Sequence, residues 1–152
     1  MTNENTHDAN QLVIFPMGKQ LCGLRAEHVA EIIRLPPITP IHNAPEYVRG
    51  VINLRGDIVT VIDLGRRLGL TELGGLNTVI IMPFGEENIG LLTEEVDDII
   101  ASQAELFEVP PTRLSGIGGT YLDSVYKLEE QLAAVLKVAQ ILKIEEEAAS
   151  AT

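Results

Sequence analysis

An internal repeat is the feature that most restricts how this chain can fold. Shifted by 67 positions, residues 12–33 align without a gap with residues 79–100. Shifted by 74 positions, residues 47–68 align in the same way with residues 121–142. The additional seven positions of the second shift fall in residues 101–120, which are rich in glycine and proline. The sequence therefore predicts one supersecondary unit that is built twice.

The repeated unit has the residue pattern of a small β-barrel. The positions that agree between the copies are mainly aliphatic residues and glycine, and they include the pairs Ile14 and Ile81, Gly23 and Gly90, Val29 and Val96, Val51 and Val125, and Val61 and Val135. Val and Ile suit pleated, half-buried strands. About five short strands curled into a barrel leave few unpaired edges, and two such units can bury a shared face. We therefore expect a mainly β fold.

These observations predict the organisation of the whole chain. Residues 11–144 form a single domain, with subdomain one at about 11–76 and subdomain two at about 77–144, intertwined around a shared core. Residues 1–10 are polar and lack periodicity, which predicts a disordered tail. Residues 145–152 form an acidic tail.

Individual elements follow from local patterns. We expect strands at 11–17, 21–24, 38–42, 77–82 and 88–92, a short helix or an irregular strand at 25–34, and a long loop at 101–120. Residues 128–144 look helical by composition, yet their repeat partner, 54–68, reads as a hairpin strand followed by a helix. The repeat therefore predicts a strand at 132–137 and a C-terminal helix only from Val138 onward.

Composition excludes several classes of protein. The net charge of -11 argues against nucleic acid and against anionic lipid, both of which select basic surfaces. The net charge is distributed unevenly along the chain, with +1 for residues 12–76 and -8 for residues 79–142. No run approaches the ~20 apolar residues of a membrane span, so we expect no direct membrane insertion. A polar N-terminus and a single cysteine, Cys22, favour a cytoplasmic location.

No set of residues has the spacing of an active site or a metal centre. The three histidines show no ligand spacing, and one cysteine cannot complete a zinc site. On one extended strand Asp57 and Asp63 would lie roughly 20 Å apart, too far for paired catalytic carboxylates. The glycines at 116–119 do not follow a phosphate-loop pattern. We therefore expect neither an enzyme nor a cofactor. A small-ligand sensor stays an alternative, although the predicted interface between the barrels is nearly all aliphatic.

Residues 50–64 form the most distinctive local motif. Two runs rich in Val and Ile flank a polar corner, which predicts a hairpin that turns at Gly56. Arg55 sits in this corner, either as a solvated turn residue or as a contact for a partner. The copies differ here, because Arg55-Gly56 aligns with Glu129-Glu130, and Arg49-Gly50 aligns with Asp123-Ser124. Folding alone does not require these residues, which favours the first copy's hairpin as a specialised surface.

Residues 50–64, with Pro45 and Tyr47 ahead of them, resemble the signature of the CheW family, the coupling proteins of bacterial chemotaxis arrays. The chain departs from that signature at Thr60, where proline is usual. The resemblance covers residues 12–144 and implies two five-stranded SH3-like barrels around a common core. It also implies an adaptor that joins the cytoplasmic tips of methyl-accepting chemoreceptors to a CheA-type histidine kinase at the inner face of the membrane, or a related adaptor of gliding or twitching motility. The partner-binding residues predicted from the resemblance and from the differences between the copies are Arg55, Glu31, Val29, Asn53, Gly56 and Arg49.

Overall fold

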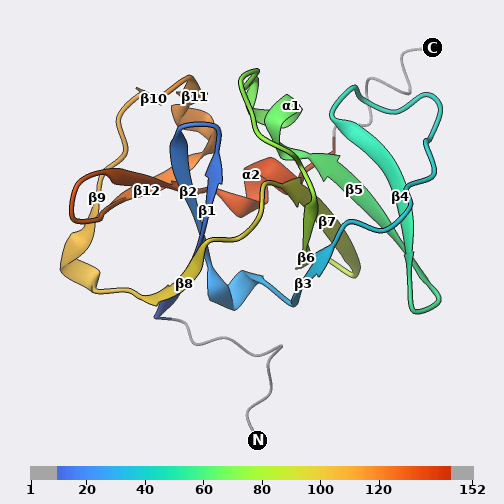
Figure 1. Cartoon of the computed structure of the whole chain (residues 1–152), viewed down its shortest axis with the longest axis horizontal. Helices are drawn as coiled ribbons and strands as arrows, with labels where there is room; N and C mark the ends of the chain where they lie inside the picture. The colour runs from blue at the N-terminus through green and yellow to red at the C-terminus, as the bar shows by residue number, and fades with distance from the viewer. Residues whose placement is uncertain (1–9, 145–152) are drawn as a thin grey trace, which may run out of the picture.

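The computed structural model describes residues 10–144, so the two predicted tails lie almost wholly outside it. The fold is mainly β (Figure 1). Its elements are β1 (Gln11–Met17), β2 (Gln20–Arg25), η1 (Ala26–His28), β3 (Glu31–Arg34), β4 (Val48–Leu54), β5 (Asp57–Asp63), α1 (Leu64–Leu68), β6 (Thr78–Phe84), β7 (Glu87–Thr93), β8 (Asp98–Ala101), η2 (Ala104–Leu106), β9 (Phe107–Glu108), β10 (Arg113–Leu114), β11 (Ile117–Gly118), η3 (Gly119–Tyr121), β12 (Leu122–Lys127), β13 (Leu132–Leu136) and α2 (Val138–Leu142). Among these residues no helix is long and apolar enough to cross a membrane.

The strands form two main sheets, which lie side by side in Figure 1. The first has the order β8-β1-β2-β13-β12-β9, and the second has the order β3-β6-β7-β5-β4. Both sheets are antiparallel except for one parallel pair in each, β2 with β13 and β5 with β7. Each sheet therefore combines the first two strands of one copy of the repeat with later strands of the other copy. The architecture is that of two SH3-like barrels that share strands across the repeat.

The repeat predicted from the sequence is confirmed in the positions of the elements. The two alignments superpose β1 on β6, β3 on β8 and α1 on α2, residue for residue. The two parallel strand pairings also have the same register. Val61 lies opposite Gly90 in one pairing, and their repeat equivalents, Val135 and Gly23, lie opposite each other in the other. The predicted strand at 132–137 and the helix from Val138 are confirmed as β13 and α2.

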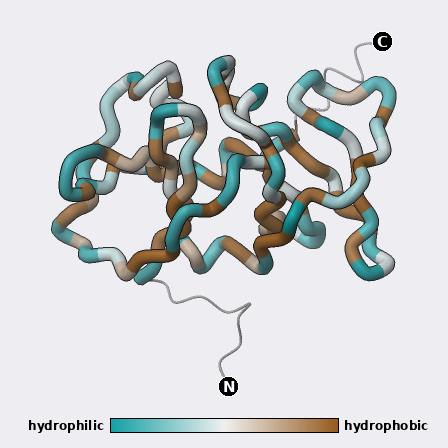
Figure 2. Tube along the Cα trace, in the orientation of Figure 1, coloured by the Kyte–Doolittle hydropathy of each residue, from teal (hydrophilic) through white to brown (hydrophobic). Residues whose placement is uncertain are grey.

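The core has three parts. The largest cluster lies between the sheets and includes Phe15, Cys22 and Leu91. Two smaller clusters fill the individual barrels, one around Val61 and one around Val135, and both valines are fully buried. Figure 2 shows the corresponding hydrophobic stretches along the strands. Burial of Cys22 raises the pKa of its thiol to about 12, so this cysteine is a neutral core residue and a poor nucleophile.

One predicted strand does not form, and the structure defines two other segments more closely than the sequence does. The predicted strand at 38–42 is wrong, because only Thr39 pairs with a strand, through a single bridge to Val51. Prolines at 36, 37 and 40 supply no backbone N–H to extend that pairing. The stretch 25–34, for which the sequence allows a helix or a strand, consists of η1 followed by β3. The predicted loop at 101–120 holds several short elements, and one of them, β9, extends the first sheet.

Candidate functional site

The β4–β5 hairpin closes in a tight turn of two residues, Arg55 and Gly56, between the paired residues Leu54 and Asp57. Both turn residues have positive φ, 52° and 93°, as a type I′ turn requires. Glycine adopts this conformation without strain, whereas arginine does so rarely. The Asn53 Oδ1 accepts a hydrogen bond from the Gly56 N–H at 2.9 Å, which fixes the corner. The turn therefore presents Arg55 on a rigid support.

Arg55 is held in place by a bidentate ion pair with Glu31. Its Nη1 donates to Glu31 Oε2 at 3.2 Å, and its Nη2 donates to the other carboxylate oxygen. Hydrogen bonding to Glu31 and the charge of that carboxylate raise the pKa of the Arg55 guanidinium. Glu31 begins β3, and β3 and β4 are the two edge strands of the second sheet. The pair therefore connects the hairpin tip to the opposite edge of the sheet.

The ion pair leaves most of Arg55 available to a partner. The arginine side chain is 68% exposed, and the Glu31 side chain is 26% exposed. Asn53 and Gly56 are also exposed at this corner, which is hydrophilic at its tip (Figure 2). The structure thus brings four of the six predicted site residues together.

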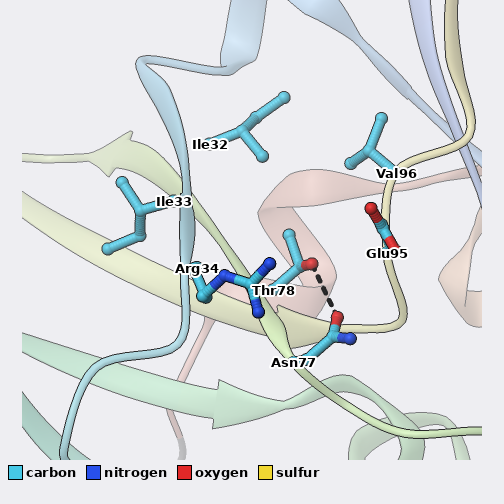
Figure 3. Close-up of a pocket in the computed structure, with 7 residues that line it drawn as sticks. All are labelled: Ile32, Ile33, Arg34, Asn77, Thr78, Glu95 and Val96. Carbon is cyan, nitrogen blue, oxygen red and sulfur yellow. Dashed lines mark hydrogen bonds between the residues drawn. The ribbon is translucent and has the colours of Figure 1, made fainter.

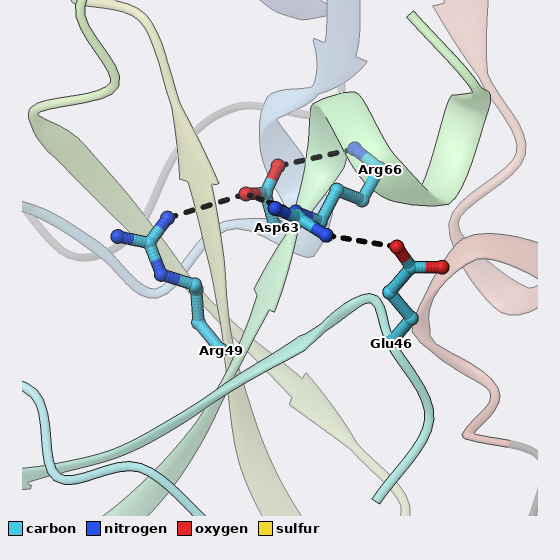
Figure 4. Close-up of polar contacts among 4 residues, drawn as sticks. All are labelled: Glu46, Arg49, Asp63 and Arg66. Atoms are coloured by element: carbon cyan, nitrogen blue, oxygen red, sulfur yellow. Dashed lines mark hydrogen bonds and ion pairs between the residues drawn. The ribbon is translucent and has the colours of Figure 1, made fainter.

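Arg49 lies at the other end of β4, in a separate network (Figure 4). Its Nη1 donates to Asp63 Oδ2 at 3.3 Å. Asp63 is nearly buried and also caps α1, because its Oδ1 accepts a hydrogen bond from the Arg66 N–H at 3.1 Å. The Arg66 side chain continues the network to Glu46 Oε2 at 2.9 Å. Arg49 therefore packs against a structural carboxylate, although its own side chain is 47% exposed.

Val29 lies in the shared core and is only 3% exposed. It follows η1 and precedes Glu31 by two residues, so it anchors the segment that carries the Arg55 partner. Ile58, by contrast, is an exposed residue that the sequence reasoning missed. It pairs with Asn53 across the hairpin and is 65% exposed. Neighbouring residues of a strand face opposite sides, so its position directly before the core residue Val59 is the signal that could have identified Ile58.

A cavity of about 260 Å³ lies beside β3, lined by Ile32, Ile33, Arg34, Asn77, Thr78, Glu95 and Val96 (Figure 3). The Thr78 hydroxyl donates to Asn77 Oδ1 at 2.9 Å on its wall. Arg34 and Glu95 bring opposite charges to it from separate segments. Within residues 10–144, no group of three or more potential metal-ligating side chains is present.

Comparison with known proteins agrees with this geometry. The CheW-like domain family matches residues 11–146. The chemotaxis protein CheW of Treponema pallidum is 30% identical over 90% of this chain and 84% of its own length. The chemotaxis protein CheW of Klebsiella aerogenes is 31% identical over 90% and 83%. The crystal structure of the scaffolding protein TtCheW from Thermoanaerobacter tengcongensis has a TM-score of 0.83, with 26% identity over 95% of each chain.

The fold and the exposed hairpin define a double-barrel β-protein with a preorganised charged corner. The family match covers nearly all described residues, and the structural neighbour shares the whole architecture. The chain belongs to the CheW-like family.

Proposed function

We propose that this protein is a non-enzymatic adaptor that couples methyl-accepting chemoreceptors to a CheA-type histidine kinase in chemotaxis. It would act in the cytoplasm, at receptor arrays on the inner face of the membrane. The names of its relatives as chemotaxis proteins support this proposal, as does the description of its structural neighbour as a scaffolding protein. The adaptor would bind two partners at once and so let receptor conformation bias kinase activity.

The observation that carries the proposal is the Arg55 corner. An arginine at positive φ is a strained choice for a tight turn, so local folding does not account for it. The ion pair with Glu31 orders the guanidinium before any partner arrives, which lowers the entropy lost on binding. Arg55, Glu31, Asn53 and Gly56 would form the contact surface. Arg49 would extend it along β4, and Val29 would support it from the core.

The first prediction tests this surface with the substitution Arg55→Glu. We expect binding to the kinase or to the receptor fragment to weaken by at least about tenfold, because a charged group at an interface centre is costly to reverse. The melting temperature should change little, because the guanidinium is exposed and its ion pair is open to solvent. Titration calorimetry with each purified partner and a thermal melt of the same variant measure both quantities.

Arg113→Glu is the matched control, because Arg113, like Arg55, is an exposed arginine on a hairpin. Its side chain donates one hydrogen bond, to the Gly116 carbonyl. This control should bind both partners normally. If Arg55→Glu is folded and binds both partners like the control, Arg55 does not belong to the functional surface. If Arg55→Glu melts well below the control and loses binding only in proportion, the arginine serves the fold instead.

A further inference from the structure

A second recognition feature lies between the two sheets, away from the hairpin corner. It is a groove of about 370 Å³, whose lining includes Arg25, His28, Phe84, Asp123, Leu136 and Lys137. The lining residues come from the end of β2, from η1, from the end of β6 and the β6–β7 turn, from β12, from the end of β13 and from the start of α2. None of them belongs to the Arg55 corner, so the groove is a separate surface.

The groove is lined by apolar and by basic side chains. Phe84, Leu136 and Val138 provide aliphatic and aromatic surface, and Phe84 and Val138 are only partly covered. Arg25 and Lys137 line the same groove, together with the imidazole of His28. Arg25 and Lys137 against Asp123 give these lining residues a net positive charge, in a protein whose net charge is -11.

Among the described residues that line the groove, Asp123 alone is acidic, and it is already paired. Asp123 Oδ2 accepts a hydrogen bond from Arg25 Nη2 at 3.1 Å. The Arg25 guanidinium also stacks over the Phe107 ring, 4.5 Å from its centroid, and is therefore fixed. Lys137, which also lines the groove, has no ion-pair partner within residues 10–144. Its ammonium group is available to an incoming carboxylate.

Lys137 carries the opposite charge to the residue at the equivalent position of the other copy. Its repeat partner is Asp63, which caps α1 and pairs with Arg49. In the second copy both charges are reversed, to Lys137 and Asp123. Lys137 stands at the N-cap of α2 but makes no capping hydrogen bond. Aspartate favours an N-cap and a cation opposes the helix dipole there, so Lys137 breaks a local folding rule that Asp63 obeys. Such violations concentrate at functional sites.

We propose that this groove binds a protein segment that presents an aspartate or glutamate next to an aliphatic side chain. The aliphatic group would pack on Phe84, Leu136 and Val138, and the carboxylate would pair with Lys137 beside the fixed Arg25. The volume is near the lower end for ligand pockets and suits one or two side chains of a partner. Because the chain as a whole carries a net charge of -11, the basic side chains of the groove also give specificity for an acidic segment. The inference rests on the proposed adaptor function and assigns a second contact surface to it.

The substitution Lys137→Asp separates binding from folding. Because it restores the capping residue of the other copy, the variant should melt at the same temperature as the parent chain or higher. Its affinity for either the receptor cytoplasmic fragment or the kinase should nevertheless fall by at least about tenfold. Lys19→Asp, the same change on the exposed β1–β2 turn, should leave both affinities within about twofold. Calorimetry with each partner, run on the full chain, provides the affinities.

A reciprocal change then identifies the carboxylate. Replacement of the acidic residues of the affected partner by lysine, one at a time, should restore binding to Lys137→Asp at a single position. If Lys137→Asp binds both partners as the parent does, the groove proposal is overturned while the adaptor function stands. If the parent chain itself binds neither partner, both proposals fall. If sedimentation shows a dimer of the chain alone that Lys137→Asp abolishes, the occupant is a second copy, and the proposal is likewise overturned.

Discussion

Arg67 is a buried arginine at a position where the second copy has Ile141. Its Nε donates to the Ile141 carbonyl at 3.1 Å, and its Nη2 donates to the carbonyls of Gln140 and Lys143 at 2.9 and 2.8 Å. These carbonyls belong to the last turn of α2, where a helix leaves its acceptors unpaired. The guanidinium also stacks on Tyr47 at 4.2 Å. One side chain from α1 therefore secures α2, at the end of the other copy.

Arg67→Met should lower the free energy of unfolding by about 2–4 kcal/mol, because three carbonyls at the end of α2, one buried and two partly buried, lose a charged donor. Urea denaturation of the full chain measures this change. Arg66→Met removes the neighbouring arginine, whose side chain is 55% exposed, and should have a much smaller effect. Equal denaturation midpoints for the two variants would show that α2 does not depend on the Arg67 contacts.

At the level of elements, the sequence is most informative where the two copies can be compared. Residues 132–136 have the composition of a helix, yet strand β13 could be predicted there. The reason is that the equivalent segment of the first copy, β5, has the pattern of a hairpin strand. Residues 38–42 have no equivalent segment for comparison, since they fall outside both alignments. Their alternation of apolar and polar residues suggests a strand, but the prolines at 36, 37 and 40 prevent it. Local pattern alone could not show that the missing N–H donors would outweigh it.

Truncation of a core valine should destabilise the protein to a similar extent in the equivalent strands β5 and β13. Val61→Ala and Val135→Ala each remove buried methyl groups from a barrel interior, and each should lower the free energy of unfolding by about 1–3 kcal/mol. The measurement is the denaturation midpoint of each variant. Thr60→Ala, next to Val61 but only partly buried, is the control and should cost less. A parent-like midpoint for either valine variant would contradict its place in the core.

For the whole molecule, the sequence could predict the repeat but not the exchange of strands between its copies. The pattern of apolar residues shows which face of a strand is buried, but it does not show which other strand lies next to it in the sheet. Because the copies share one pattern, β2 could pair with β5 or with β13, and the structure has β13. The candidate site was predictable to a similar degree. The turn at Arg55 followed from the residues, and the family resemblance marked Glu31 as a further contact residue. The ion pair between the two and the groove at Lys137 required contacts between distant segments, which the structure supplies.

The exchange of strands predicts that neither half of the chain folds alone. In a fragment of residues 1–76, β1 and β2 lack β8, β12 and β13, while β3, β4 and β5 lack β6 and β7. Isolated hairpins are marginal in water, so each fragment, 1–76 or 77–152, should give the circular dichroism and amide NMR spectra of an unfolded chain. An equimolar mixture should regain the native spectrum as a one-to-one complex in sedimentation, because each fragment supplies the strands that the other lacks. A folded monomer of either fragment would mean that each copy can close its own barrel, and that the shared sheets are not required for folding.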